Sequence, residues 1–487
     1  YINILIRNQN DWGASYSFSS QNLKKSIYDS IPGADCISYH EKAVHILRDR
    51  FNRENRGKED ELINQMLRAG MDSEVKEYIT ETAEEMVVNK SINAAIQFLE
   101  HAYGLISRDG HTEERIMISS KLGELNCYIG EYSKAILQYD VVEKLAAADG
   151  DTKLLIDVYI RKYSLLYKSG DGKASLNYLS AAKKLLGTVD YRKGIYELII
   201  TINRMMLHKR KFGTYIKILE NALSTIDREK YRFHYARMLG ISGRFLAYKG
   251  RPSEGLERLL ESVRILEDME IYRKQLYPLN AIGSVYYNHY NDKQKAREYY
   301  ERCLSISQKI SDPYYLGISY NNIAEIYRME DKHSEALQFY QNSLKNSIII
   351  RDKYVEYIAY LNISMTNMEI EDYNKALLIY NDMEREFISS KYSGDLMDLF
   401  NQCKAEFCYA MGEYEEASEY ARKSVDMCKS WGISVNYEAH FVGLMSGIQQ
   451  SGTLDFKRDN EFLDTVFGDN LYKLGRTACV KLAELYA

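Results

Sequence analysis

The fold is decided by a pattern that recurs in LGELNCYIGEYSKAILQYDVV (122–142), NIAEIYRMEDKHSEALQFYQNSL (322–344) and CKAEFCYAMGEYEEASEYARKSV (403–425). Each stretch begins with apolar residues at helical spacing and continues through a short polar turn. A second apolar-periodic segment follows, with a small residue early and an aromatic residue about four positions later. Apolar residues three and four apart are typical of amphipathic helices. Each stretch therefore predicts two helices joined by a tight turn.

The early small position recurs along most of the chain. Its members are Ala95, Ala135, Ala174, Tyr215, Gly255, Ala296, Ala336, Ala376 and Ala417. Successive members are 39 to 41 residues apart. A period of this length is typical of arrays in which each supersecondary unit buries its apolar face against the next. The sequence predicts an all-α, right-handed solenoid of about nine helical hairpins.

Close packing explains the pattern. Two antiparallel helices approach closely only where one presents a small side chain, and an aromatic ring on the same face, such as Tyr300 or Tyr340, fills the space beside it. Small residues such as Gly123 and Gly283 are expected to face the second helix from the first. A glycine inside a helix costs about 1 kcal/mol relative to alanine, so its recurrence indicates a packing requirement.

These residues resemble the tetratricopeptide motif, which has Leu-Gly-x-x-Tyr in the first helix and Ala-x-x-x-Phe/Tyr in the second. The resemblance covers roughly residues 72–430. The unit here is about 40 residues long, whereas the family unit has 34, and the proline that commonly closes a unit is missing. The resemblance implies a concave groove, lined by the first helices, that binds a peptide, a protein or a small molecule.

The amino-terminal segment has a different pattern. Alternation in YINILIRNQ and ASYSFSS, on either side of NDWG, predicts a β-hairpin, and a helix is expected to end at Pro32-Gly33. The segment resembles the tail of the winged-helix module in signal-transduction ATPases with numerous domains (STAND), in which such a module precedes tetratricopeptide repeats. The matching positions are Phe18, Ser19, Ile27, Tyr28, Ile31, Pro32, Tyr39 and His40.

Four segments are expected in all. They are a partial winged-helix-like segment (1–38), a helical linker pair (39–71), the repeats (72–430) and a degenerate terminal repeat or capping pair (431–487). The abrupt start at Tyr1 suggests that the sequence was excised from a longer protein. On the STAND resemblance, that protein carries an ATPase domain before this region and an effector after it, for example a LuxR-like DNA-binding domain, a diguanylate cyclase or a kinase.

Charge and composition exclude several classes of partner. The 64 basic and 69 acidic residues give a net charge of -5, so no general field attracts nucleic acid or an anionic membrane. No apolar stretch is long enough to span a bilayer. The seven cysteines are scattered singly, which is typical of a reduced, cytoplasmic protein.

Catalytic and cofactor-binding motifs are not found. SGDGKAS (169–175) has Tyr167 and Ala174 where a phosphate-binding loop needs glycine and a hydroxyl, so it is expected to be an ordinary turn. His40 and His45 are five residues apart and point about 140° apart on a helix, which argues against a zinc site. We expect no catalytic residue, no metal and no cofactor, and therefore no enzyme activity in this chain.

Ten residues are expected to line the groove of the central units. Arginine can grip a carboxylate or phosphate, asparagine can pair with a peptide backbone, and tyrosine offers stacking area. The candidates are Arg204, Arg237, Arg244, Tyr248, Tyr277, Asn280, Tyr287, Asn321, Glu325 and Arg328. Charge reversal at Arg244 together with Arg328 is expected to abolish binding without lowering the melting temperature.

Three functions stay open from the sequence. The first is a sensor and scaffold region of a multidomain, bacterial-type signalling or transcription regulator, which relays binding to the ATPase and effector domains. The second is a stand-alone adaptor for protein–protein interaction. The third is the regulatory arm of a diguanylate cyclase or kinase. The winged-helix resemblance favours the first, because an adaptor has no use for such a segment.

Overall fold

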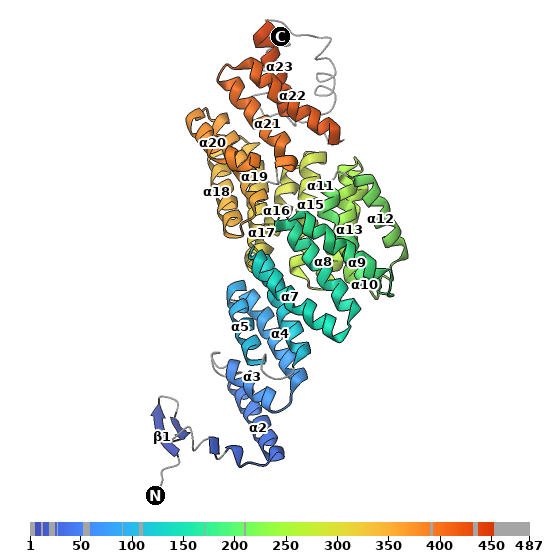
Figure 1. Ribbon diagram of the computed structural model, residues 1–487. Coiled ribbons are helices and arrows are strands. Elements are labelled where there is room, and N and C mark those ends of the chain that lie inside the picture. Colours follow the sequence, from blue (N-terminus) through green and yellow to red (C-terminus); the bar gives the residue numbers. More distant parts are fainter. Residues whose placement is uncertain are drawn as a thin grey trace. The chain divides into compact units, whose positions relative to one another are not determined.

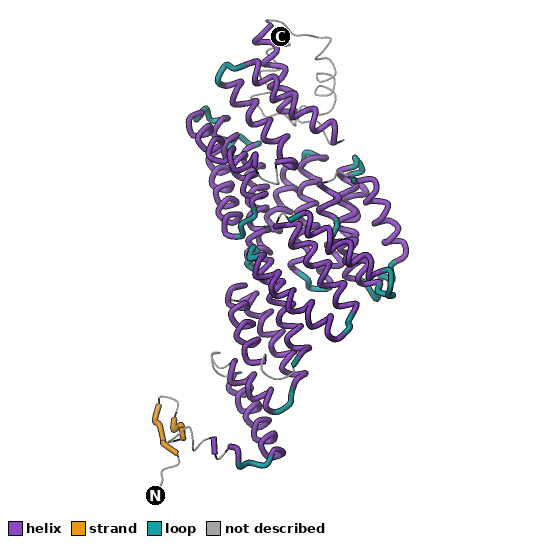
Figure 2. Tube along the Cα trace, viewed as in Figure 1, coloured by secondary structure: helices purple, strands orange, loops and turns teal. Residues whose placement is uncertain are grey.

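The computed structural model describes residues 5–10, 13–18, 25–26, 28–51, 59–89, 91–106, 111–169, 171–208, 211–389, 393–431 and 437–451. The chain divides into two compact units, Tyr1–Ser119 and Ser120–Ala487, each of which is considered by itself. Helices dominate both (Figures 1 and 2). None of the described helices combines the length and apolar character that a bilayer span requires.

The first unit begins with two short strands. Strands β1 (Leu5–Asn10) and β2 (Gly13–Phe18) pair antiparallel, with Leu5 opposite Phe18 and Asn10 opposite Gly13. The winged-helix assignment of this segment stays a prediction from the sequence, and much of the helix expected before Pro32 lies outside the described residues. The helices that follow are α2 (Gly33–Phe51), α3 (Glu59–Arg68), α4 (Asp72–Asn89), α5 (Ile92–Ile106) and the start of α6 (Thr112–Tyr128).

One histidine of the first unit is part of its packing. His40 is buried on α2, where its Nε2 lies 2.7 Å from Tyr28 Oη and its Nδ1 lies 2.5 Å from Gln65 Oε1 on α3. His45, on the same helix, is exposed. Both ring nitrogens of His40 are therefore occupied by hydrogen-bond partners, and the two histidines do not converge on a metal site.

The second unit is a succession of antiparallel helical hairpins. Its first helices alternate with its second helices, and each hairpin packs on its neighbours in sequence (Figure 1). After α6, the helices are α7 (Tyr132–Asp149), α8 (Thr152–Ser169), α9 (Gly172–Leu186), α10 (Arg192–Thr201), α11 (Asn203–His208), α12 (Phe212–Thr225), α13 (Arg232–Tyr248), α14 (Pro252–Asp268), α15 (Tyr272–Tyr290), α16 (Lys293–Lys309), α17 (Pro313–Arg328), α18 (His333–Ile349), α19 (Lys353–Glu369), α20 (Tyr373–Ser389), α21 (Ser393–Ala410), α22 (Tyr414–Trp431) and α23 (Tyr437–Ser451).

The predicted hairpins are present through α4–α22, and one first helix is broken. In the unit centred on Tyr215, α10 ends at Thr201 and α11 begins at Asn203, whose side-chain Nδ2 donates to Ile200 O at 2.6 Å. Asparagine competes for backbone carbonyls in this way, which disfavours a continuous helix. The terminal segment predicted from 431 is described only as far as α23.

The recurring position early in the second helices is buried, but its assignment in one unit has to be corrected. Ala135, Ala296 and Ala336 are each 0% exposed, as the packing argument requires. Ala174 was the wrong choice for its unit: it is only half-buried in the first turn of α9, where its N–H donates to Asp171 Oδ1 at 2.9 Å. The neighbouring Ser175 is fully buried and takes that place. With this change, the spacing on either side becomes 40 residues.

Glycines of the first helices make room for rings of the second helices. A Cβ at Gly283 on α15 would lie 2.4 Å from Cε1 of Tyr300 on α16, and one at Gly123 would lie 2.7 Å from Cζ of Tyr139. Both rings are 3% exposed. Since real Cβ atoms do not approach a ring so closely, the absence of a side chain sets the distance between the two helices of each hairpin.

We expect Gly283→Ala to lower the free energy of unfolding by about 1–3 kcal/mol, because overpacking against Tyr300 must move a helix. Gly213→Ala is the matched control, since the nearest atom to its Cβ is 3.9 Å away and the residue is exposed near the start of α12. Chemical denaturation should show a loss for the first variant only. Equal stability of the two variants would contradict the packing argument.

Candidate functional site

A cavity of about 560 Å³ lies within the second unit. Its wall consists mainly of the first helices of seven consecutive hairpins, α6, α8, α10–α11, α13, α15, α17 and α19, as expected for the concave side of a solenoid. Tyrosine, asparagine and basic residues dominate this wall. A volume in this range is typical of pockets for small ligands.

The array returns to its own beginning at this cavity. A Cβ at Gly130, in the turn between α6 and α7, would lie 1.8 Å from the carbonyl oxygen of Ile350, in the turn between α18 and α19. Beside this contact, Arg351 Nη2 lies 3.4 Å from Glu131 Oε1. These two turns are 220 residues apart in sequence. This contact therefore bounds one side of the cavity. If the array of hairpins curved less, the two turns would not meet and that side would be open.

Two further contacts join distant hairpins across the cavity. The Arg273 guanidinium on α15 lies 3.1 Å from the centre of the Tyr128 ring on α6. The Arg204 guanidinium on α11 lies 6.0 Å from the centre of the Tyr354 ring on α19. Cation–π attraction of this kind is worth about 0.5–2 kcal/mol. The cavity is therefore held together by side chains as well as by the contact between turns.

The turn contact can be tested with two glycines of equal backbone conformation. Gly130 and Gly250 both have φ of 76°, but a Cβ at Gly250 would meet nothing within 4 Å. Alanine at either position costs about 1 kcal/mol of left-handed strain, and only Gly130→Ala also collides with Ile350. We expect Gly130→Ala to raise amide hydrogen exchange in the α18–α19 turn, measured by mass spectrometry. Equal exchange there in both variants would contradict the closure.

The structure brings six of the ten predicted groove residues to this cavity. They are Arg204, Arg237, Arg244, Tyr277, Asn280 and Asn321. Tyr287, Glu325 and Arg328 line a smaller cavity of about 270 Å³, which shares Asn321 with the first. Tyr248 is 42% exposed and lines neither, although its hydroxyl accepts hydrogen bonds from Arg244 Nε and Nη2 at 3.1 and 2.9 Å. Their role as a binding site stays a proposal.

The asparagines pair with one another between hairpins. Asn322 Nδ2 donates to Asn280 Oδ1 at 2.7 Å, and Asn362 Nδ2 donates to Asn321 Oδ1 at 3.0 Å. In both pairs, the tenth residue of one first helix bonds to the ninth residue of the preceding first helix, so the same arrangement is repeated in successive hairpins. These bonds fix the orientation of the amides along the wall of the cavity.

Arg328 is buried and ion-paired, which argues against the expectation that its charge can be reversed without loss of stability. Its side chain is 7% exposed and forms an ion pair with Glu325 at 2.7 Å and another with Glu369. Tyr340 Oη also donates to Glu325 Oε2 at 2.6 Å. Burial acts to raise the pKa of Glu325, but the charge and hydrogen bonds of Arg328, with those of Tyr340 and Tyr287, lower it below its ordinary value.

We expect Arg328→Glu to lower the free energy of unfolding by about 3–5 kcal/mol, because it replaces a cation that is 7% exposed with a carboxylate beside Glu325 and Glu369. Arg351→Glu, at a position whose side chain is 71% exposed, is the comparison and should cost far less. Thermal melting at neutral pH measures both. A melting temperature unchanged by Arg328→Glu would show that the ion pairs do not stabilise the fold.

Two of the basic side chains that line the cavity form ion pairs with carboxylates that do not line it. Arg237 Nη1 lies 2.6 Å from Glu197 Oε1, and Arg273 Nη2 lies 2.8 Å from Oδ2 of the fully buried Asp312. Burial acts to raise the pKa of Glu197, but the hydrogen bond with His234 and the charge of Arg237 lower it to about 2. The carboxylate of Glu197 therefore stays ionised and fixes Arg237.

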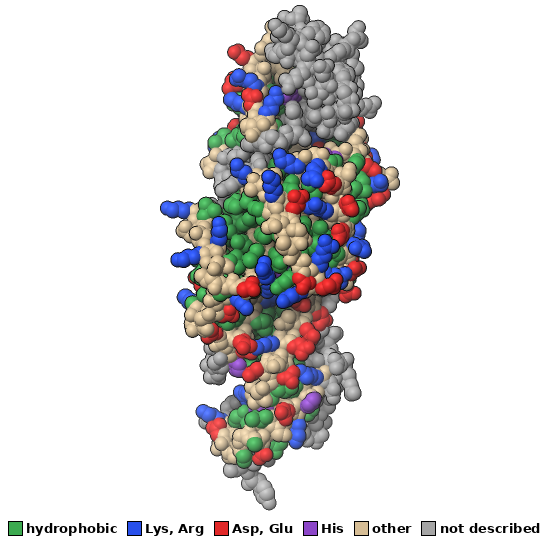
Figure 3. All heavy atoms as spheres, turned by 90° about the vertical axis from the view of Figure 1, so that its right-hand side faces the viewer, with side chains coloured by type: hydrophobic (Ala, Val, Ile, Leu, Met, Phe, Trp, Pro, Cys, Tyr) green, Lys and Arg blue, Asp and Glu red, His purple; other side chains and the backbone are tan. Residues whose placement is uncertain are grey.

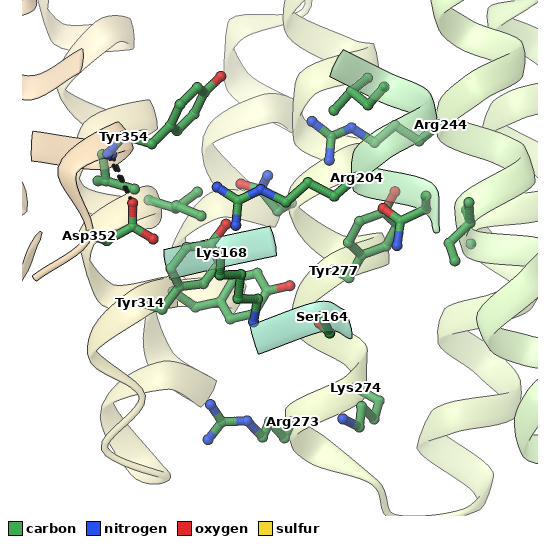
Figure 4. A pocket seen from close by; sticks show the side chains of 18 of the residues that line it. Ser164, Lys168, Arg204, Arg244, Arg273, Lys274, Tyr277, Tyr314, Asp352 and Tyr354 are labelled. Carbon is green, nitrogen blue, oxygen red and sulfur yellow. Dashed lines mark hydrogen bonds between the residues drawn. The ribbon is translucent and has the colours of Figure 1, made fainter. Parts of the chain in front are cut away.

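Arg244 and Lys274 differ from these two. The polar and ring contacts of Arg244 are with tyrosines: it bonds to Tyr248 Oη and lies 5.5 Å from the Tyr277 ring centre. Burial, followed by the nearby charge of Arg237, lowers the pKa of Lys274 to about 8. Figure 4 shows Arg204 and Arg244 on one side of the cavity, and Arg273 and Lys274 on the other.

Several residues of the cavity were missed by the sequence analysis. Arg273 and Lys274 lie in the first turn of α15, and Tyr314 and Asp352 lie where α17 and α19 begin. The predicted positions were all taken from the middle and later turns of first helices. Residues at helix starts reach the cavity because the array curves until hairpins distant in sequence face each other. The repeat spacing contains no information on that curvature.

One group of potential metal ligands lies elsewhere. The ligand atoms of Cys408, Glu413 and Glu416 lie within 4.8 Å of one another, with the cysteine buried and both glutamates exposed. Burial raises the pKa of the Cys408 thiol to about 11. A thiol with this pKa is protonated at neutral pH, whereas metals bind the thiolate. The buried Cys408 side chain therefore serves packing and is a poor metal ligand.

Comparisons with known proteins point to the repeat. Residues 274–349 match the family model described as tetratricopeptide repeat. No curated protein matches the chain. Similar solved structures include a Rap protein complexed with Competence and Sporulation Factor, with 14% identity, a TM-score of 0.49, and coverage of 74% of this chain and 99% of that one.

Two other solved structures are similar to the chain. A STAND protein with a tetratricopeptide repeat sensor from Pyrococcus horikoshii has 12% identity and a TM-score of 0.40, with 98% of this chain and 59% of that chain covered. Aspartyl phosphate phosphatase F from Bacillus subtilis has 14% identity and a TM-score of 0.42, with 73% and 96% covered. At these values the likenesses carry no functional conclusion. Residues 274–349, which span nearly all of α15–α18, are tetratricopeptide repeats.

Proposed function

We propose that the second unit is a non-catalytic sensor that binds a small molecule or a short peptide inside its cavity. The observation that carries this proposal is a partly enclosed cavity of about 560 Å³, lined by hairpins whose turns meet at Gly130 and Ile350. An open groove suits a large protein partner, whereas an enclosed space suits a ligand that fits within it. Repeat arrays use their concave side for binding in this way.

Binding in this cavity would act on the curvature of the whole unit. A ligand that touches α6, α13 and α19 together would connect hairpins that are distant in sequence and that face one another because the array curves. Successive hairpins pack mainly on their neighbours, so a small change of angle at every step adds up along the array. A ligand that favours one curvature shifts the population of the unit toward it. This is the property that a sensor needs.

We infer that the sensor belongs to a multidomain regulator of signalling or transcription. The support is the sequence resemblance of the first 38 residues to the winged-helix tail of STAND proteins. In such a protein, the change of curvature would be relayed to an ATPase and to an effector domain. The chain described here would supply recognition and leave the chemistry to those domains.

The proposal can be tested by filling the cavity. Ser164 on α8 lines it (Figure 4), so Ser164→Trp should place an indole in the space that the ligand needs. Ser305→Trp, at an exposed position of α16, is the matched control. A thermal-shift screen of neutral and charged peptides and metabolites should yield binders that raise the melting temperature of the wild type and of Ser305→Trp.

Such binders should have no effect on Ser164→Trp, whose own melting temperature shows whether it is folded. Binders that act equally on both tryptophan variants would contradict the assignment of the site. The same screen, followed by hydrogen exchange with and without a binder, should report slower exchange in the α6–α7 and α18–α19 turns if the ligand favours closure.

A further inference from the structure

The cavity wall has a strong excess of positive charge. Six basic residues line it, and the acidic lining residue is Asp352. The basic residues are Lys168, Arg204, Arg237, Arg244, Arg273 and Lys274. The chain as a whole has a net charge of -5, and both signs are interspersed on the face shown in Figure 3. The excess is therefore a property of the cavity and not of the surface in general.

Part of this charge has no carboxylate to neutralise it. Glu197 and Asp312 pair with Arg237 and Arg273 from behind the wall. Among the described residues, by contrast, no carboxylate lies within ion-pair distance of Arg244 or Lys274. Gathering cations in a partly dehydrated cavity is unfavourable unless an anion joins them.

A buried hydroxyl at the same wall also lacks a partner. Tyr163 on α8 lines the cavity and is 1% exposed, and its Oη has no hydrogen-bond partner among the described residues. Buried polar atoms are nearly always paired, so this hydroxyl can take a partner from outside the chain, such as water or a ligand. This observation is independent of the charges and points to the same place.

We propose that the occupant of the cavity is a small polyanion, with at least two phosphate or carboxylate groups. This inference rests on the proposed binding function and specifies its ligand. Arg204 and Arg244 would hold one anionic group, and Arg273 and Lys274 would hold another on the opposite side (Figure 4). Tyr277 and Tyr314 lie between these two sides in the same view and offer ring faces to the part that joins the groups.

The partial enclosure favours a small molecule as the ligand. A nucleic acid strand also combines phosphates with rings that stack on tyrosine, but it needs a groove that is open along its length. The contact of the Gly130 turn with Ile350 bounds this space on one side, which favours a compact ligand over a strand. Guanidinium groups bind phosphate and carboxylate alike, so both chemistries fit the site.

The protonation of Lys274 links binding to pH. Besides burial, the charged groups that face it are Arg237 on α13 and Arg273 on its own helix, which lower its pKa, and Glu124 on α6 and Glu197 on α10, which raise it. Their combined effect is a pKa of about 8. A bound anion favours the protonated form, so the ligand binds with proton uptake above pH 8. Affinity should therefore be constant below about pH 8 and fall above it.

The same reasoning predicts an unusual effect on stability. The pKa of Lys274 is lower in the folded chain than in the unfolded chain, so its charge opposes folding at neutral pH, and this penalty disappears as the pH rises through 8 to 10.5. Lys274→Met should therefore raise the melting temperature of the ligand-free protein at pH 7 while weakening binding. A lysine with a purely structural role would lower the melting temperature when replaced.

The experiment is isothermal titration calorimetry at about 0.1 M salt with pyrophosphate, citrate and adenosine triphosphate, alongside adenosine and a 12-nucleotide single strand. We expect a small polyanion to bind. Arg244→Met and Lys274→Met should weaken it by about 10- to 100-fold, the effect of losing one charged hydrogen bond. Lys217→Met, which removes an exposed charge from α12, is the control and should leave binding unchanged. Preference for citrate over the phosphates identifies a carboxylate ligand.

Three results would overturn the inference. The first is binding of neutral compounds that Ser164→Trp blocks, with no binding of any polyanion; the proposed sensor function would then stand without its charged ligand. The second is tighter binding of the 12-nucleotide strand than of adenosine triphosphate. The third is equal weakening by Lys217→Met and Lys274→Met, which would indicate a non-specific effect of charge. Absence of any cavity-dependent binder would instead contradict the proposed function itself.

Discussion

The distance between paired helices is the constraint on which the rest of the second unit depends. Where Gly283 faces the Tyr300 ring, a single additional carbon does not fit. The marker position of the second helices, Ala296 in this hairpin, returns about every 40 residues, so each hairpin is offset from the last by nearly the same step. Repeated steps of equal size produce a regular curve. The meeting of Gly130 with Ile350, and with it the enclosed cavity, is the sum of these steps.

Helix starts connect this curve to the charges inside it. Asp312 Oδ1 accepts hydrogen bonds from the N–H groups of Tyr314 and Tyr315, which caps α17, while its Oδ2 pairs with Arg273. Asp352 caps α19 in the same way, 40 residues later, and lines the cavity. Capping carboxylates are favoured at helix starts by the exposed N–H groups and the helix dipole. A position required by the repeat thus also places negative charge next to the cationic wall.

The hairpins could be predicted from the sequence because they depend on local spacing. The small position at Ala135 and the ring at Tyr139 are four residues apart, and this interval alone indicates which helix face is buried. Choosing between Ala174 and Ser175 needed the structure, because both are small. The residues of the candidate site were harder to predict from the sequence. Arg244 was found because it lies mid-helix, but the burial of Arg328 depends on Glu369 of the next hairpin.

Curvature is the part of the structure that spacing does not contain. Two arrays with the same 40-residue period can differ in the angle between hairpins and hence in which residues face each other after several repeats. In the sequence, nothing therefore distinguishes Lys274 from other basic residues at helix starts. In the closed array it lies near Arg237 and Arg273, and its pKa falls to about 8. Identifying such a residue requires the path of the whole array and not the motif of one unit.

Closure and charge act in opposite directions at the cavity. The contact of the two turns draws the wall together, whereas Arg244, Lys274 and their basic neighbours repel one another across it, more strongly as water is excluded. A bound anion of matching size would attract these basic side chains, so the electrostatic interaction would then favour the closed form of the array. Ligand charge and array curvature would then be coupled through one interaction. On the proposed function, this coupling would let a small ligand alter the angle between hairpins that lie outside its reach.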